Sequence, residues 1–324
     1  MMNNWRHLLF NTLATLLFAP TAVFSQHGVA PRIIIVDGRE RSFLLYVPAT
    51  VDATQATPLV LAFHGANGSG ASIMGRFRAV ADREGFLVCC PDGVNKWWNA
   101  GPAEEVRATG GADDVKFVGE LIEEIARLHP LDRRRVYACG MSNGGALSHT
   151  LGVRLSDKLA AIAPVAATMP NVTAAHLNRA GPMPVLQIIG SLDNVVRREG
   201  LLGLAETCLK WAAHNGCATT ADINEWPDRD SDDGTRVIES VWQAPSNGAG
   251  VRLLLIEGGL HSWPIGHAGG RPQPAGQQKA SREFDAGEEI WKFFSANPKP
   301  MAAVGQPSTE LTHSKAAASG RGGK

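Results

Sequence analysis

Residues 135–145 read RVYACGMSNGG, a short apolar strand that runs into a glycine-rich turn. The turn fits the pattern G-x-S-x-G with Ser142 at its centre, and a helix is expected from about Asn143 to about Arg154. Strand, turn and helix in this order are typical of a nucleophile elbow, in which the serine hydroxyl is exposed and helix amides favour developing negative charge. The stretch therefore predicts a nucleophilic serine. The alternative is a glycine-rich loop that holds an ordinary serine.

Short apolar runs recur along the rest of the chain, and segments with helical spacing separate them. Strands that alternate with helices predict an α/β fold with a mostly parallel central sheet and helices on both faces. Ala71–Arg83 has helical spacing. Asp113 and Asp114 are expected to begin a long amphipathic helix at Val115, because carboxylates stabilise a helix N-terminus. The expected strands are Arg32–Ile35, Ser42–Val47, Pro58–Phe63, Phe86–Cys90, Arg135–Cys139, Ala160–Val165, Val185–Ile189 and Val251–Ile256.

The residues that would activate Ser142 can be sought by chain order, because a nucleophile elbow is followed first by an acid and then by a histidine. The histidine takes the serine proton, and the acid holds the histidine ring in one tautomer. Asp193 lies in the loop after the expected strand Val185–Ile189, and His261 lies soon after the expected strand Val251–Ile256. We therefore predict a catalytic triad of Ser142, Asp193 and His261. A plain turn residue is the alternative for Asp193, and the other histidines after the serine are His149, His176, His214, His267 and His313.

Backbone N–H donors are needed where negative charge develops on the attacked carbonyl oxygen. One donor is expected from Asn143, the residue after the nucleophile. The second is expected from the glycine-containing loop His64–Gly68, where either Gly65 or Ala66 fits the role. His64 itself is expected to structure this loop rather than to act as a second base.

Two tryptophans adjoin these motif loops. Trp98 lies in the loop after the strand Phe86–Cys90, and Trp263 lies close behind His261. Aromatic faces suit phenolic or apolar esters, so both side chains are expected to line a substrate pocket. The alternative for either tryptophan is a place in the hydrophobic core.

The cysteines and acidic residues give weaker signals. The chain has five cysteines, of which Cys208 and Cys217 flank the end of one expected helix and form the candidate disulfide. No Cys/His cluster with zinc spacing occurs, so no metal site is expected. Asp228–Gly234 is rich in carboxylates, but its glycine falls one position away from where a calcium loop requires it. An acidic hairpin turn is therefore the preferred interpretation of that segment.

One catalytic domain is expected between two segments that do not belong to the fold. Residues 1–25 combine a basic start, an apolar run and small residues before a cleavage point, as in a secretory signal peptide. An uncleaved membrane anchor is the alternative. The catalytic domain is expected over residues 26–296, and residues 297–324 have too few large apolar residues to order themselves. A secreted protein, extracellular or periplasmic, is the resulting expectation.

The charges are balanced, with 31 Lys plus Arg against 31 Asp plus Glu among 324 residues and a pI of about 7.2. Such a balance provides no electrostatic footprint for nucleic acid or for an anionic membrane surface. A neutral organic molecule is therefore the expected binding partner.

The motifs taken together resemble a known family. They occur in the order Phe63-His64-Gly65, Trp98-Asn99, Ala112-Asp113-Asp114-Val115, Arg135-Val136-Tyr137, Gly140-Met141-Ser142-Asn143-Gly144-Gly145, Ala161–Val165, Gly190-Ser191-Leu192-Asp193 and Gly258-Gly259-Leu260-His261-Ser262-Trp263-Pro264. From about Arg32 to Phe294 the chain resembles the secreted poly(3-hydroxybutyrate) depolymerase-like and feruloyl esterase-like enzymes of carbohydrate esterase family 1. The resemblance implies an α/β-hydrolase fold and hydrolysis of carboxylic esters, without a cofactor, by Ser142, Asp193 and His261.

Several functions stay open after this comparison of motifs. Feruloylated xylan, acetylated glycan and hydroxyalkanoate oligomers are all candidate substrates. A catalytically idle hydrolase fold that binds glycan or polymer through its tryptophans is one alternative. Transfer of the acyl group to an alcohol instead of water is another.

Overall fold

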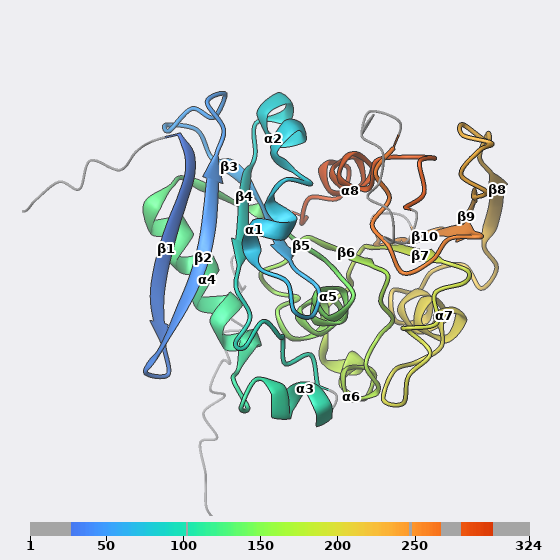
Figure 1. Cartoon of the computed structure of the whole chain (residues 1–324), viewed down its shortest axis with the longest axis horizontal. Helices are drawn as coiled ribbons and strands as arrows, with labels where there is room; N and C mark the ends of the chain where they lie inside the picture. The colour runs from blue at the N-terminus through green and yellow to red at the C-terminus, as the bar shows by residue number, and fades with distance from the viewer. Residues whose placement is uncertain (1–26, 102, 246–247, 267–279, 301–324) are drawn as a thin grey trace, which may run out of the picture.

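The computed structural model of the protein describes residues 27–101, 103–245, 248–266 and 280–300. Over these ranges one sheet of ten strands runs through the molecule in the order β1-β2-β4-β3-β5-β6-β7-β10-β9-β8 (Figure 1). The strands are β1 Gly28–Val36, β2 Arg39–Val47, β3 Thr57–Phe63, β4 Leu87–Pro91, β5 Leu131–Met141, β6 Ala161–Val165, β7 Val185–Gly190, β8 Asp222–Glu225, β9 Arg236–Trp242 and β10 Val251–Glu257. The helices are α1 Gly70–Met74, α2 Arg78–Glu84, α3 Ala103–Ala108, α4 Asp114–Leu128, α5 Asn143–Arg154, α6 Asn171–Ala174, α7 Leu204–His214 and α8 Ala286–Ser295.

The centre of the sheet is parallel, and antiparallel pairs lie at its two sides. β3 pairs in parallel with β4 and β5, and the parallel run continues through β6 and β7 to β10. β1 and β2 pair antiparallel at one edge, and β9 and β8 do so at the other. The predicted α/β fold with a mostly parallel sheet is confirmed. Because the carboxyl ends of parallel strands meet at one edge of a sheet, the loops after β3, β5, β7 and β10 share that edge.

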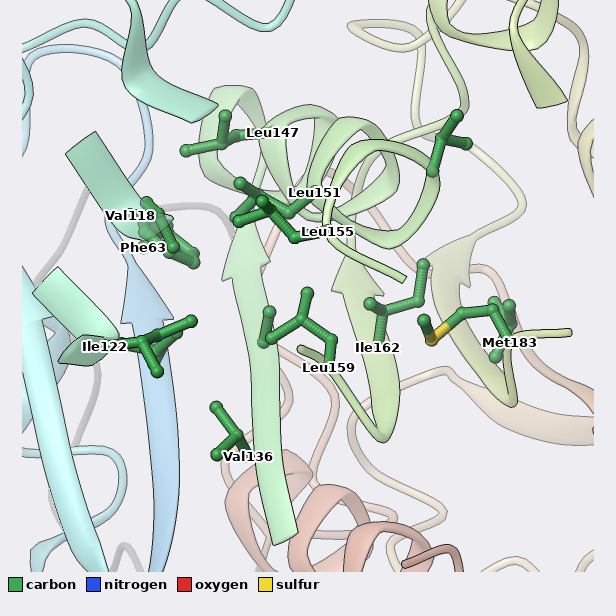
Figure 2. Packing of buried hydrophobic residues seen from close by; sticks show 14 of the residues in the cluster. Phe63, Val118, Ile122, Val136, Leu147, Leu151, Leu155, Leu159, Ile162 and Met183 are labelled. Atoms are coloured by element: carbon green, nitrogen blue, oxygen red, sulfur yellow. The ribbon is translucent and has the colours of Figure 1, made fainter. Parts of the chain in front are cut away.

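β3 shows why the sheet is covered on both faces. Its sequence TPLVLAF has no polar alternation, and the whole strand is buried. Leu59, Leu61 and Phe63 belong to the apolar cluster that includes α4, α5 and α7, whereas Val60 and Ala62 belong to the cluster that includes α2 and α8. Figure 2 shows part of the first cluster, with leucines of α5 turned toward the strands. Burial of one such leucine or phenylalanine contributes about 1.5–3 kcal/mol.

A buried ion pair joins β2 to the first turn of α4. The side chains of Arg41 and Asp114 meet at 2.5 Å and are 3% and 0% exposed. The second carboxylate oxygen of Asp114 accepts a hydrogen bond from the Asn99 backbone N–H at 2.7 Å. Burial raises the pKa of Asp114, and the neighbouring Arg41 opposes that rise. Asp113 caps the helix as predicted, accepting from the Lys116 N–H at 2.9 Å, so the two adjacent carboxylates have different tasks.

The helical spacing of Ala71–Arg83 corresponds to two helices, because the chain forms α1 and α2 with a break between them. Gly75 closes α1, and Phe77 stands outside the helical conformation at the N-cap of α2. The buried Phe77 ring packs edge-on against Trp263, with ring centroids 5.9 Å apart. This tertiary contact and the low helix propensity of glycine outweigh the helical spacing of the sequence.

β8 and β9 lie outside the set of predicted strands. β8 reads DINE and is wholly exposed, so its sequence has no apolar pattern by which a strand is recognised. It is held at the sheet edge by antiparallel pairing with β9. Residues 226–235 connect the two strands, and the hairpin turn predicted at Asp228–Gly234 is confirmed.

The predicted disulfide between Cys208 and Cys217 is wrong, because all five cysteines carry free thiols. Cys208 lies within α7, about 6 Å along the helix axis from Ala212. The Cys217 N–H donates to the carbonyl of Ala212, which places Cys217 at the helix end. Its thiol turns away to the carbonyl of Ala249, at 3.2 Å. Flanking one helix end in sequence therefore does not bring the two sulfur atoms together.

The structure describes only part of the two segments that flank the predicted catalytic domain. The predicted signal peptide, residues 1–25, lies outside the described residues. Residues 297–300 belong to the tail predicted as disordered, but the Lys299 N–H donates to the Arg134 carbonyl at 2.8 Å, and Arg134 Nε donates back to the Lys299 carbonyl at 2.9 Å. These two hydrogen bonds hold residues 297–300 against β5, although this part of the chain has a polar composition. The rest of the predicted tail, residues 301–324, lies outside the described residues. Within the described ranges, no helix is long and apolar enough to cross a membrane.

Loss of the buried ion pair is expected to destabilise the fold. Arg41→Ala leaves the Asp114 carboxylate buried without its partner, and such a change costs about 3–5 kcal/mol of unfolding free energy. Arg83→Ala is the control, since Arg83 pairs with Glu288 at 2.5 Å with both side chains well exposed, and exposed pairs contribute at most about 1 kcal/mol. Urea unfolding of both variants measures the difference; equal losses would contradict the assignment of Arg41.

The free thiols are expected to be countable. Ellman's reagent should find five thiols per chain after denaturation without reductant, and three would indicate a disulfide. In the native protein, Cys217 is expected to react first because it is half-buried and the other four are buried. Burial raises the pKa of the Cys208 thiol to about 12, which suppresses its thiolate. Cys217→Ser should remove the fast phase of the native reaction.

Candidate active site

Ser142 stands in a strained turn between β5 and α5. Its φ of 56° and ψ of −119° lie in a region that side chains rarely adopt, and such a residue costs about 1–3 kcal/mol. Its N–H donates to the carbonyl of Val165 on β6 at 2.9 Å, which fixes the turn against the sheet. This strand, strained turn and helix have the backbone geometry of a nucleophile elbow, the arrangement that the sequence predicted.

Glycines around Ser142 let three backbone segments meet. A Cβ on Gly144 would lie 2.4 Å from the carbonyl oxygen of Phe63, and one on Gly140 would lie 2.6 Å from the carbonyl carbon of Gly144. Real Cβ atoms essentially never come this close to backbone. The start of α5 therefore packs directly on the end of β3, which no larger residue would allow.

The loops after β7 and β10 carry the predicted acid and base, and they pack on each other. The Leu192 N–H donates to the Gly259 carbonyl at 2.9 Å, and the Gly258 N–H donates to Ser191 Oγ at 3.0 Å. A Cβ on Gly190 would lie 2.3 Å from the Gly259 carbonyl oxygen. Two segments far apart in the sequence are thus held at a fixed spacing by hydrogen bonds and close backbone packing.

Asp193 and His261 meet where these loops join. His261 Nδ1 lies 2.8 Å from Asp193 Oδ2, with side chains 16% and 0% exposed. The second carboxylate oxygen of Asp193 accepts from the Val195 N–H at 3.0 Å. With Nδ1 donating to the carboxylate, Nε2 is left free to accept a proton. Among the described residues, no hydrogen bond joins His261 to Ser142; in substrate-free sites such bonds are often long and tighten when substrate binds.

The loop after β3 lies against Ser142. A Cβ on Gly65 would lie 3.5 Å from Ser142 Cβ. In the described part of the chain, the N–H groups of Ala66 and Asn143 donate no hydrogen bond to protein atoms. The structure therefore leaves both Gly65 and Ala66 as candidates for the second oxyanion donor, as the sequence did.

His64 structures this loop. It is buried, its Nε2 accepts from the Gly93 N–H at 3.0 Å, and its Nδ1 lies 2.7 Å from the Gly65 carbonyl oxygen. Burial lowers the pKa of His64, so the ring stays neutral with its proton on Nδ1. Both ring nitrogens are occupied by backbone groups, which is why His64 is a poor candidate for a second base.

The histidines that compete with His261 lack a carboxylate partner or lie elsewhere. His149 is fully buried in α5 and accepts a hydrogen bond from Trp211 at 3.1 Å, and burial lowers its pKa to about 3. His176 and His214 each lie beside a backbone carbonyl. His267 and His313 fall outside the described residues.

The placement of both tryptophans in the substrate pocket is wrong. Trp98 is 0% exposed and Trp263 is 4% exposed, so neither ring offers a face to a ligand. The Trp98 indole N–H donates to the His64 carbonyl at 2.9 Å, and Trp263 packs on Phe77. A buried tryptophan that finds a partner for its N–H is a stable core residue. A sequence position beside a motif loop therefore does not tell whether a tryptophan lines the substrate pocket or packs in the core behind it.

A cavity of about 550 Å³ opens beside the acid loop. Apolar side chains from the segment between β7 and α7, from the start of α7 and from β10 line it together with two arginines: Val196, Arg197, Arg198, Leu201, Leu202, Leu204 and Leu255. Sequence reasoning missed these residues, since a leucine in a loop has no spacing or neighbour that marks it as a pocket residue. Among the described residues, no group of three His, Cys, Asp or Glu side chains could hold a metal ion.

A family model described as esterase PHB depolymerase matches residues 41–196, which include the elbow and Asp193. Over these residues the chain is similar to this esterase family. It is 28% identical over 249 residues to feruloyl esterase B of Piromyces equi, covering 71% of this chain and 44% of that longer protein. It is 24% identical over 238 residues to feruloyl esterase C of Emericella nidulans, covering 71% of this chain and 79% of that one. The protein is therefore a carboxylic ester hydrolase.

A solved structure supports the fold independently of sequence. An acetyl xylan esterase from Aspergillus awamori superposes with a TM-score of 0.57 at 13% identity, covering 82% of this chain and 99% of that one. At this identity the likeness concerns the fold alone. The fold of this chain is thus the α/β-hydrolase fold that the motif series implied.

Because the backbone around Ser142 is closely packed, a single added methyl group at Gly144 is expected to lower esterase activity strongly. Gly144→Ala places a Cβ 2.4 Å from Phe63 O and 2.5 Å from His64 O, so α5 must shift by roughly an ångström, enough to lower kcat/KM about 100-fold. Gly119→Ala in α4 is the control, because its Cβ would meet only a Leu155 methyl at 3.8 Å. Ester hydrolysis by both purified variants measures the effect. Full activity of Gly144→Ala would contradict the packing described.

Proposed function

We propose that the protein is a secreted serine esterase that works through Ser142, Asp193 and His261 and a covalent acyl-enzyme. The observation that carries the proposal is the hydrogen bond between His261 and the buried Asp193 carboxylate, at the same sheet edge as the strained Ser142. A strained backbone is retained where function requires it. A buried carboxylate on Nδ1 is what a histidine base needs to stay in one tautomer.

The chemistry begins with attack of Ser142 Oγ on the ester carbonyl carbon. His261 Nε2 takes the hydroxyl proton, and Asp193 stabilises the resulting imidazolium. The tetrahedral intermediate collapses, the C–O bond to the alcohol breaks, and His261 returns the proton to the departing alkoxide. Water then attacks the acyl-Ser142 ester with His261 again as base, releasing the carboxylic acid and restoring the serine.

Negative charge on the carbonyl oxygen would be stabilised by backbone donors. The Asn143 N–H lies at the first turn of α5, where the helix dipole favours an anion. Gly65 or Ala66 would supply a second N–H from the loop that lies against Ser142. Donors held in place before reaction need no reorganisation, and each contributes about 10²–10³ in kcat.

For the substrate we propose a neutral carboxylic ester, either a feruloyl or acetyl ester of a glycan or a hydroxyalkanoate polyester. The support is the names of the relatives and of the matched family, together with a net charge of zero. The mainly apolar cavity beside the acid loop fits an apolar or phenolic acyl group. Secretion through residues 1–25 belongs to the same proposal and rests on the sequence pattern.

Replacement of the nucleophile is the direct test. Ser142→Ala is expected to lower kcat on 4-nitrophenyl acetate by at least about 10⁴-fold, because triad members act as a unit. Asp193→Asn should cost about as much by misorienting His261 while leaving KM nearly unchanged. Ser156→Ala is the control, since its hydroxyl accepts from the Gly181 N–H at 2.9 Å beyond the C-terminal end of α5, away from the loops that carry the proposed triad. Retention of most activity by Ser142→Ala would refute the triad.

A further inference from the structure

The loop after β4, residues 92–98, contacts both halves of the oxyanion site. One half is Asn143, directly after Ser142 at the start of α5. The other half is the segment His64–Gly68 after β3. Trp98, at the end of the β4 loop, is hydrogen-bonded to both halves. The residue that joins them, through its backbone on one side and its indole on the other, is one that the sequence analysis placed in the substrate pocket.

The Asn143 carboxamide clamps the backbone of Trp98. Its Oδ1 accepts from the Trp98 N–H at 2.7 Å, and its Nδ2 donates to the Trp98 carbonyl at 3.0 Å. Asn143 is 2% exposed, so water does not compete for these bonds. The clamp fixes the β4 loop relative to the first turn of α5, and therefore relative to the Asn143 N–H.

The Trp98 indole holds the other half through a peptide plane. Its Nε1 donates to the His64 carbonyl at 2.9 Å. Because a peptide unit is planar, fixing the His64 carbonyl also fixes the direction of the Gly65 N–H. The Trp98 ring has no room to turn, since it is fully buried and packs edge-on against Phe63 at 5.3 Å.

The next peptide plane is fixed in the same way. His64 Nδ1 donates to the Gly65 carbonyl at 2.7 Å, which sets the direction of the Ala66 N–H. His64 is itself held by the Gly93 N–H on Nε2, and the Asn67 N–H donates to the Lys96 carbonyl at 2.9 Å. Whichever of Gly65 and Ala66 donates to the oxyanion, the β4 loop sets its orientation.

We propose that the side chains of Trp98 and Asn143 are positioning residues, which lock the two halves of the oxyanion hole at a fixed spacing. Neither side chain touches the reacting atoms. The inference rests on the proposed function, because it assumes that charge develops beside Ser142. Loss of either bond lets one half drift, and a displacement of about 1 Å from reacting geometry lowers the rate about 100-fold.

Asn143→Ala tests the clamp, and the chain offers a matched control. Asn215 makes the same pair of bonds to the backbone of Met183, with Oδ1 accepting at 3.0 Å and Nδ2 donating at 2.7 Å, and it is 6% exposed. Both alanine variants should lose a similar amount of thermal stability. Asn143→Ala alone should lower kcat on 4-nitrophenyl acetate about 10- to 100-fold with little change in KM.

A tetrahedral adduct separates positioning from general damage. An aryl trifluoromethyl ketone forms an oxyanion on the nucleophile, so its affinity should fall with kcat in Asn143→Ala, whereas KM and the inhibition constant of a non-covalent substrate analogue should not. Asn215→Ala should leave all of these values unchanged. Equal effects of the two variants on kcat, or wild-type kcat and adduct affinity in Asn143→Ala, would overturn the proposal.

Trp98→Phe removes the indole bond to His64 and keeps an aromatic ring. Its control is Trp211→Phe, because Trp211 is also fully buried and donates its indole N–H to His149. Only Trp98→Phe should show the loss in kcat and in adduct affinity, and this second variant decides the matter if Asn143→Ala does not fold. Ser142→Ala, assayed in parallel, separates the two proposals: an active Ser142→Ala refutes the triad, whereas an inactive Ser142→Ala with a fully active Trp98→Phe refutes only the positioning.

Discussion

The site depends on how closely the start of α5 approaches the end of β3. Gly140 and Gly144 remove the side chains that would hold these backbones apart. This approach puts the strained Ser142 beside the segment that begins at His64, so the proposed nucleophile and the proposed oxyanion donors lie next to each other. The sheet holds Ser142 in its strained conformation, because the Ser142 N–H donates a hydrogen bond to the Val165 carbonyl on the next strand.

The strand order brings the three loops of the proposed triad together. β5 is separated from β7 by β6 alone, and β7 is paired in parallel with β10, so the three loops that carry Ser142, Asp193 and His261 emerge at one edge. Hydrogen bonds between the loops that carry Asp193 and His261 then fix the spacing that the Asp193–His261 hydrogen bond requires. Around this core, buried polar groups such as Arg41 and Asp114 anchor the supporting elements.

The sequence predicted the parts whose signals are local. Apolar strand runs, the G-x-S-x-G turn and the cap at Asp113 each follow from a few neighbouring residues, and the fold and the elbow agree with those predictions. Chain order predicted Asp193 and His261 as a pair, and the two side chains are hydrogen-bonded, because chain order reflects strand order in this type of sheet. The break between α1 and α2 could not be predicted from the helical spacing of Ala71–Arg83, because the contact of Phe77 with Trp263 is tertiary.

Other features depend on contacts that no local pattern contains. The position of Trp98 beside a site motif is the same whether its ring faces a ligand or packs in the core. Only its burial and its hydrogen bond to His64 show that it packs in the core. The free state of Cys208 and Cys217 depends on side-chain direction around a helix end. The exposed strand β8 has no apolar alternation, and its existence follows from pairing alone.

Covalent labelling tests the central claim most directly, namely that Ser142 is the nucleophile. The protein would be treated with a fluorophosphonate, and its intact mass and tryptic peptides would then be measured. We expect one adduct per chain, located on the peptide that contains Ser142, with loss of esterase activity in proportion to labelling. An adduct on another residue, or full inactivation with Ser142 unmodified, would contradict the account.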